Sequence, residues 1–255
     1  MKSFKKFLIL PLITILLFGC DQITNPLSPD ASETSQNLSG QPLPSLAKQV
    51  DFQGVLASIG YEIKFNENLP ATFISMGFAQ IGKFADAGKV TVNNSELNKT
   101  EKDGKIFYLS PNAQNITGLS NVNFDGSQHN WSVEGNDSIS AFTGSIASPT
   151  IFSVSSPENN STVNKENGLE ITWDGSATDS KILIIVASEN TDIAPYVKEN
   201  LPDNGSFSIP SSDLSSFSGK VYLQVAKYNY TTKNNNGKNY LLISEIVKLK
   251  TLTIK

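Results

Sequence analysis

Alternation of polar and apolar residues with a period of two constrains this chain more than any other feature of its sequence. From residue 50 onward, short stretches rich in aromatic and β-branched residues alternate in this way, with clear examples at 61–65, 129–133 and 169–173. Such alternation is typical of strands that bury one face. Gly, Asn, Asp and Pro separate the stretches, and no long run has the 3.6-residue period of an amphipathic helix. We therefore predict an all-β protein.

The strand signals fall into two groups, which predicts two β-sandwich domains. Residues 20–49 are rich in Ser, Pro, Asn and Gln and hold few large apolar side chains, so we expect a flexible tether there. We place one sandwich at residues 50–148 and a second at residues 149–255, with the boundary near Pro149. The second domain holds about seven strand signals, so we expect it to fold alone.

The second half also carries a more specific pattern, in which a proline-containing start is followed by apolar residues that alternate up to a tryptophan. These motifs resemble the second and sixth strands of fibronectin type III and related immunoglobulin-like domains, and the residues concerned are Leu169, Ile171, Trp173, Val221, Leu223, Val225 and Asn229. The resemblance covers roughly residues 150–255 and implies a sandwich with Trp173 in its core. The sequence departs from the family at Val221, where a tyrosine is usual, and at Lys227, where alanine is usual.

The first 20 residues form a pattern that predicts where in the cell the protein is located. The first six include three lysines and no acid, and residues 7–19 are uncharged and mostly aliphatic. This is the layout of a secretory signal, and the apolar run is shorter than the roughly 20 residues that a membrane-spanning helix needs. The run ends in Leu17-Phe18-Gly19-Cys20, which resembles the lipobox of bacterial lipoproteins. The resemblance implies cleavage after a signal peptide of residues 1–19 and a diacylglycerol on the thiol of Cys20, the only cysteine of the chain.

The lipid would place the protein in the cell envelope, anchored to a bacterial membrane. Asp21 resembles an inner-membrane retention signal of some bacteria, but other lineages read this position differently. We expect attachment to the outer membrane or display at the cell surface. Membrane lipid is then one partner, and an unknown protein or glycan is another.

Charge and composition exclude several functions. Without residues 1–19 the chain has 17 lysines, no arginine and 24 acidic residues, a net charge of −7. Nucleic-acid binding needs a basic face, so we do not expect it. We expect no cofactor, because no glycine-rich phosphate loop precedes a helix signal. We also expect no metal site, because the chain has one histidine and its one cysteine is assigned to lipid.

The residues that could support catalysis are few. His129 is the only histidine, and it alternates with Trp131 and Val133, which favours a packed histidine over a catalytic one. We expect both tryptophans, Trp131 and Trp173, to lie in cores. Carboxylates alone suffice for some hydrolases, but they need a deep cleft. We therefore expect no enzyme.

The last strand pair is the most promising binding surface in the sequence. We expect strands at 219–229 and 240–252, joined by a long polar loop at 231–239. Tyr228 and Tyr230 stand at the base of this loop, and Lys233 and Asn235 lie within it. Loops on rigid sandwiches often carry binding residues, and tyrosines are enriched at binding hot spots.

No motif in the sequence identifies a ligand. The function that fits best is a membrane-anchored envelope lipoprotein with a non-enzymatic binding or structural role. A carbohydrate-binding accessory lipoprotein is the alternative, which an exposed aromatic platform would favour. A small carboxylate-dependent hydrolase is the third reading, which two facing carboxylates in a cleft would favour.

Overall fold

The computed structural model describes residues 52–63, 72–111, 118–175, 179–190 and 192–255, and residues 51–255 form one compact unit. The predicted signal peptide and tether, including Cys20, lie outside the described residues. Strands account for nearly all of the described secondary structure, which confirms the prediction of an all-β protein. Two short helical segments accompany them, the 3-10 turn η2 (Lys165–Asn167) and helix α2 (Ser211–Leu214).

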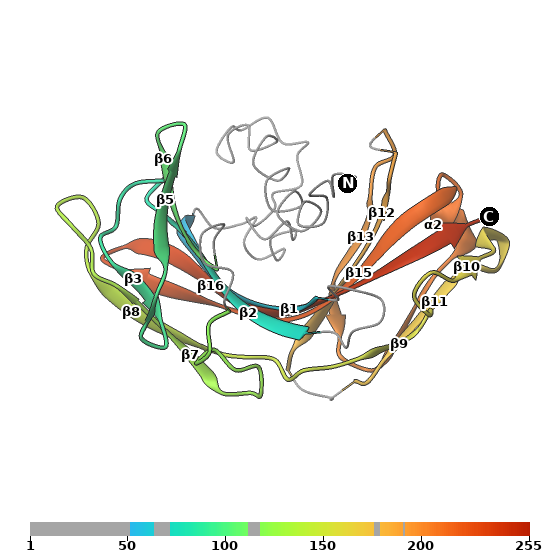
Figure 1. Ribbon diagram of the computed structural model, residues 1–255, viewed down its shortest axis with the longest axis horizontal. Coiled ribbons are helices and arrows are strands. Elements are labelled where there is room, and N and C mark those ends of the chain that lie inside the picture. Colours follow the sequence, from blue (N-terminus) through green and yellow to red (C-terminus); the bar gives the residue numbers. More distant parts are fainter. Residues whose placement is uncertain (1–51, 64–71, 112–117, 176–178, 191) are drawn as a thin grey trace, which may run out of the picture. The chain divides into compact units, whose positions relative to one another are not determined.

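The largest sheet contains strands from both ends of the described sequence (Figure 1). In spatial order its strands are β13 (Tyr196–Pro202), β12 (Lys181–Ser188), β15 (Gly219–Asn235), β16 (Lys238–Ile254), β1 (Phe52–Ile63), β2 (Thr72–Ile81), β6 (Lys105–Ser110) and β5 (Asn98–Lys102). The short strand β10 (Thr162–Val163) pairs with the end of β16. We call this the main sheet.

Two smaller sheets complete the unit. The first contains β14 (Ser206–Ile209), β11 (Leu169–Trp173) and β9 (Val154–Ser156), in that order. The second contains β4 (Ser95–Glu96), β3 (Val90–Val92), β7 (Gln128–Val133) and β8 (Phe142–Ala147). Side chains of both small sheets and of one face of the main sheet belong to a single core cluster, in which Trp131 is 1% and Trp173 is 5% exposed. Both tryptophans therefore lie in the core, as predicted.

The hairpin of β15 and β16 is longer than the sequence suggested. Each strand has 17 residues, and the two pair without interruption from Gly219↔Ile254 to Asn235↔Lys238. Only Asn236 and Gly237 form the turn, with φ of 51° and 76°. Both angles are positive, as the tight turns of two-residue hairpins require, and Asn-Gly is the dipeptide that favours them. The prediction of a long loop at 231–239 is wrong, because most of these polar residues continue the strands.

The long hairpin joins the two halves of the sequence into one sheet. Strand β1 pairs in parallel with β16, from Phe52↔Asn239 to Tyr61↔Val247, and β1 also pairs with β2. At about 3.3 Å per residue, a 17-residue strand spans some 55 Å, far more than the 17–20 Å of an ordinary strand. Its two ends therefore serve both halves. The residues on both sides of the predicted boundary near Pro149 lie in the one compact unit of residues 51–255.

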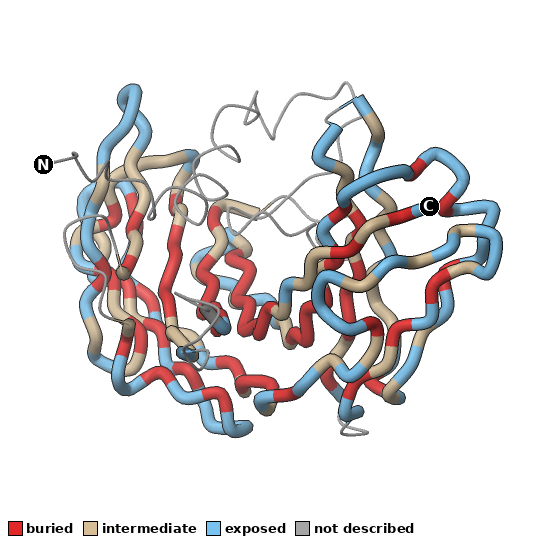
Figure 2. Tube along the Cα trace, turned by 45° about the vertical axis from the view of Figure 1, so that its right-hand side comes forward, coloured by how far each residue is buried: buried red, intermediate tan, exposed pale blue. Residues whose placement is uncertain are grey.

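Both faces of the main sheet are apolar. The core cluster includes apolar side chains from one face of β1, β2, β12, β15 and β16. Apolar side chains on the opposite face are also buried, at 8% exposure or less: Ala57, Ile59, Tyr61, Met76, Phe78, Leu183, Ala226, Tyr228, Leu241, Ile243 and Val247. Figure 2 shows continuous runs of buried residues along the central strands. This two-sided burial explains why residues 181–187 are apolar without alternation.

A buried ion pair lies in the core on the C-terminal side of the unit. The ammonium of Lys227 is 2.9 Å from Oδ2 of Asp203, and the two side chains are 1% and 0% exposed. The indole N–H of Trp173 donates to Oδ1 of Asp203 at 2.8 Å, and the Lys227 ammonium lies 4.8 Å from the ring centroid of Phe152. The buried Lys227 is therefore neutralised by an acid.

Candidate functional site

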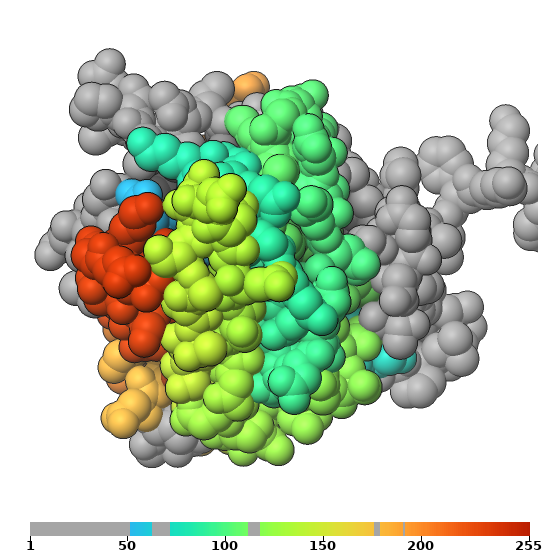
Figure 3. All heavy atoms as spheres, turned by 90° about the vertical axis from the view of Figure 1, so that its left-hand side faces the viewer, coloured from blue at the N-terminus to red at the C-terminus, as the bar shows by residue number. Residues whose placement is uncertain are grey.

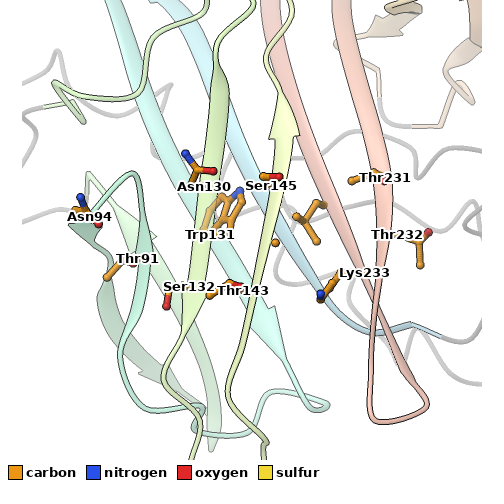
Figure 4. Close-up of a pocket in the computed structure, with 12 residues that line it drawn as sticks. Thr91, Asn94, Asn130, Trp131, Ser132, Thr143, Ser145, Thr231, Thr232 and Lys233 are labelled. Atoms are coloured by element: carbon orange, nitrogen blue, oxygen red, sulfur yellow. The ribbon is translucent and has the colours of Figure 1, made fainter.

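A polar groove of about 600 Å³ extends from β3 and β7 across β8 to β15 and β16 (Figure 4). In the space-filling view, the red tip of the β15–β16 hairpin lies directly beside the yellow-green surface of β7 and β8 (Figure 3). Most of the lining residues carry hydroxyl or amide groups. The lining consists of Thr91, Asn94, Asn130, Trp131, Ser132, Thr143, Gly144, Ser145, Thr231, Thr232, Lys233 and Leu242. We call this the β8–β15 groove.

The free edge of β8 faces this groove. Asn93 N–H donates to the Asn130 carbonyl at 2.8 Å and Glu134 N–H donates to the Lys89 carbonyl at 2.8 Å, so the even-numbered residues of β7 bond toward β3. The odd-numbered residues of β7 must then bond toward β8, where their partners are Phe142, Gly144 and Ile146. By the same alternation, the backbone N–H and C=O groups of Thr143 and Ser145 point away from β7. Strand β8 is the last in its sheet, so these groups have no ladder partner in the described part of the chain.

Asparagine side chains hold β8 against β15 at both ends of the groove. At one end, Asn229 Nδ2 donates to the Ala147 carbonyl at 2.8 Å. At the other, Asn235 Nδ2 donates to the Ala141 carbonyl at 3.3 Å and to the Ser140 carbonyl at 3.4 Å. Residues two apart on a strand share a face, so Thr231 and Lys233 point the same way as the two asparagines. These bonds place β15 directly beside the edge of β8.

Trp131 belongs to the lining of the groove, although its side chain is buried. Its side chain is 1% exposed, and its Nε1 has no hydrogen-bond partner among the described residues. Trp131 pairs across the strands with Gly144, where an added Cβ would lie 2.8 Å from Cδ2 of Leu242. A larger residue at position 144 would therefore require the Leu242 side chain to shift.

The lining of the groove carries a positive charge. Lys233 is the one charged residue among the twelve that line the groove, and none of the twelve is an Asp or Glu. In Figure 4 Lys233 lies across the groove from Thr143, on the opposite strand. A ligand with hydrogen-bonding groups and a negative charge is complementary to this lining.

The structure separates the four residues that the sequence grouped into one binding surface. Lys233 lines the groove, and Asn235 closes one end of it. Tyr228 is 5% exposed, and its hydroxyl donates to Oδ1 of Asn200 at 3.0 Å, so it lies on the other face of the main sheet. Tyr230 is half-buried and stacks on Tyr228 with ring centroids 6.1 Å apart. The sequence missed the contribution of β8, because nothing in it places residues 143–145 beside residues 231–233.

His129 is packed in the core, as the sequence predicted. Its Nε2 lies 2.8 Å from the Asn123 carbonyl, which can only accept, so Nε2 carries the proton. Its Nδ1 then accepts from the hydroxyl of Ser58 at 2.7 Å, and Ser244 Oγ lies 3.2 Å away. Ser58, His129 and Ser244 are all 0% exposed. The arrangement orients and satisfies a neutral imidazole, and it offers no surface to a substrate.

Because His129 is buried, we expect the stability of the folded protein to depend on pH. Desolvation lowers the pKa of His129 in the folded protein, with a smaller opposing effect of its hydrogen bond to Asn123. Below about pH 6.5 the unfolded chain therefore binds more protons than the folded protein. The free energy of unfolding that is present above this pH declines as the pH falls through the lowered pKa of His129. We expect chemical denaturation between pH 7.5 and 5.5 to show this decline, and His129→Gln to reduce its slope. An equal slope in the variant would contradict the assignment.

The described residues hold no group of three or more His, Cys, Asp or Glu side chains arranged to share a metal ion. No helix in the described ranges is long and apolar enough to span a bilayer. A comparison with known protein families found no family that matches the chain, and a search of curated proteins found no similar sequence.

Proposed function

We propose that this protein is a lipid-anchored protein of the bacterial cell envelope that works without catalysis, by binding a partner in the β8–β15 groove. The observation that carries the binding role is the stretch of β8 edge at Thr143 and Ser145 that has no ladder partner among the described residues and lines the groove with Thr231 and Lys233. Such groups are normally paired or covered, and here they line a cavity. The groove lies within the size range of sites that bind small ligands and peptide segments.

The strand arrangement of the C-terminal half supports its assignment to the immunoglobulin-like class. Strands β14, β11 and β9 form one sheet, and β13, β12, β15 and β16 form part of the other. This distribution of seven strands is the one that such sandwiches have. Because the fold hosts many functions, the proposed role rests on the groove and not on the fold.

The proposed location in the cell envelope rests on the sequence Leu17-Phe18-Gly19-Cys20, which follows a short apolar run. Replacing Cys20 by Ser should block both acylation and cleavage, since the thiol is the acceptor and the acylated cysteine is what the peptidase recognises in the resembling family. Membrane fractionation and mass spectrometry measure both events. A Cys20→Ser protein that still appears in the membrane fraction cleaved before residue 20 would contradict the proposed anchor.

The binding role is tested by photo-crosslinking in intact cells. A photoreactive residue at Ser145, exposed in the groove, should give a discrete adduct with a partner. The matched control carries the same residue at Glu101, which is exposed on β5 at the far end of the main sheet. We expect no adduct from Glu101. Adducts from Glu101 alone, or from neither position, would contradict binding in the groove.

A further inference from the structure

We propose that the β8–β15 groove binds an acidic saccharide, a short sugar chain that carries a carboxylate, across the outer face of β3, β7 and β8. This inference rests on the proposed binding role and names the chemical class of its ligand. It follows from three properties of the lining: the face on which its side chains lie, the hydrogen-bonding groups that they leave available, and their single charge.

Most of the polar lining lies on the outer face of the four-stranded sheet. Side chains alternate between the two faces of a strand, and those that flank Thr91 on β3 and Ser132 on β7 belong to the core cluster. Thr91, Ser132 and Thr143 are cross-strand neighbours in that order, and Asn130 is the neighbour of Ser145. These five side chains therefore turn away from the core and form one polar surface (Figure 4). A ligand on this surface does not need the edge of β8, where β15 already lies.

The hydroxyl groups of the lining are available to a ligand. Within the part of the chain that the structure describes, five of these side chains make no hydrogen bond: Thr91, Ser132, Thr143, Ser145 and Thr231. Sugar hydroxyls donate and accept as those of Ser and Thr do, so they can replace the water that such groups otherwise bind. The groove volume of about 600 Å³ equals that of about 20 water molecules in the liquid, so it takes a short sugar chain and not only a small ion.

The groove offers no exposed aromatic face. Trp131 is the only aromatic residue among the twelve of the lining, and it is 1% exposed. A sugar is therefore held here by hydrogen bonds and charge, and stacking on an aromatic ring contributes nothing.

The charge of the lining favours a carboxylate over a neutral sugar and over a phosphate. Lys233 is half-buried, makes no ion pair with any described residue, and carries the only charge of the lining. Its ammonium attracts an anionic group, and one carboxylate balances it. A phosphate monoester carries a charge of about −1.5 to −2 at pH 7, and the lining holds no second cation to balance the rest.

Calorimetric titration of the full-length protein, purified in detergent, tests the ligand class. The probes are trisaccharides of uronic acids with several linkages, the same trisaccharides as methyl esters, and neutral trisaccharides. Esterification removes the negative charge and keeps the ring hydroxyls. We expect at least one of the acids to bind, and its affinity to fall about five- to tenfold in the ester, because a charge-assisted hydrogen bond is lost.

Two pairs of substitutions test whether the ligand lies in the groove. Lys233→Met should lower the affinity for the acid about as much as esterification does, and it should leave the affinity for the ester unchanged. Lys102→Met, on the exposed end of β5, changes the net charge equally and should have no effect. Thr143→Val removes one hydroxyl of the lining and should weaken the acid and the ester alike, by about threefold, whereas Thr100→Val on β5 should not. Thermal melting checks that each variant is folded, and Lys233→Gln or Thr143→Ala replaces a variant that is not.

Four results would overturn the inference: no acid that binds, esters that bind as tightly as the acids, binding of the acids that survives both groove substitutions, or an equal loss of affinity in Lys102→Met. Photo-crosslinking at Ser145 separates this failure from failure of the proposed function. If no trisaccharide binds and Ser145 still gives its adduct in cells, the groove binds a partner of another class and only the saccharide inference is wrong. If neither result is obtained, the proposed function fails as well.

Discussion

Replacing Asp203 by Asn or Lys227 by Met should lower the free energy of unfolding by about 3–5 kcal/mol in each single variant, while the double variant should stay within about 1 kcal/mol of the wild type. The reason is that both side chains are almost completely buried. Each single substitution keeps one charge in the core and removes the opposite charge that neutralises it. The double variant holds no charge there.

The choice of Asn keeps a second interaction constant. Trp173 Nε1 donates to Oδ1 of Asp203, and an asparagine at position 203 still offers an oxygen to this donor. The cycle therefore isolates the ion pair from the hydrogen bond of the tryptophan. Met at position 227 retains an unbranched chain to pack near Phe152, which limits the cavity.

Urea denaturation of the four proteins at pH 7 measures these differences. The expected result is strong coupling, in which the second substitution restores most of the stability that the first removed. Single losses below about 1 kcal/mol would mean that water reaches the pair. Losses that add in the double variant would mean that the two charges do not stabilise each other in the folded state.

The sequence predicts the elements of this protein better than their arrangement. Alternation of polar and apolar residues identifies strands because it depends only on neighbouring residues, and β7 and β11 show the alternating burial that it predicts. It also places Trp131, His129 and Trp173 in the core. Strand pairing is not local, so the parallel pair of β1 and β16 leaves no signal in either segment.

The error about the loop of the last hairpin has a physical cause. Polarity at residues 231–239 suggested a loop, but polar side chains are compatible with a strand where one face meets a strand edge instead of a core. Asn229 and Asn235 are polar because they bond to carbonyls of β8. The Asn236-Gly237 dipeptide was the available signal for a tight turn, and it marks the true end of the hairpin. The candidate groove could not be predicted, because residues 143–145 and 231–233 are more than 80 residues apart in the sequence.

A fragment of residues 51–148 should fail to fold, which is the largest effect that the structure predicts. Strand β1 would lose β16, its parallel partner, and the four-stranded sheet would lose the hairpin residues that it packs against, such as Leu242 beside Gly144. Tyr240, which stacks on Phe142 with ring centroids 4.2 Å apart, would be absent too. The apolar area exposed at β1 and β8 is too large for the remaining strands to cover.

The same reasoning links the fold to the candidate site. The β8–β15 groove combines a strand of the first half with a strand of the second, so it exists only if both halves form one cooperative unit. Two independent sandwiches joined near Pro149 would hold β8 and β15 together only by chance. The cooperativity of the unit is therefore the central claim on which the groove and its proposed ligand depend.

Thermal unfolding of three purified proteins, followed by circular dichroism and calorimetry, tests this claim most directly. Residues 51–255 should melt in one transition, with equal calorimetric and van't Hoff enthalpies, and residues 51–148 should show no cooperative transition. Residues 149–255 serve as the comparison, since they retain the whole hairpin. A cooperative melt of residues 51–148 alone, or two separate transitions in residues 51–255, would contradict the claim.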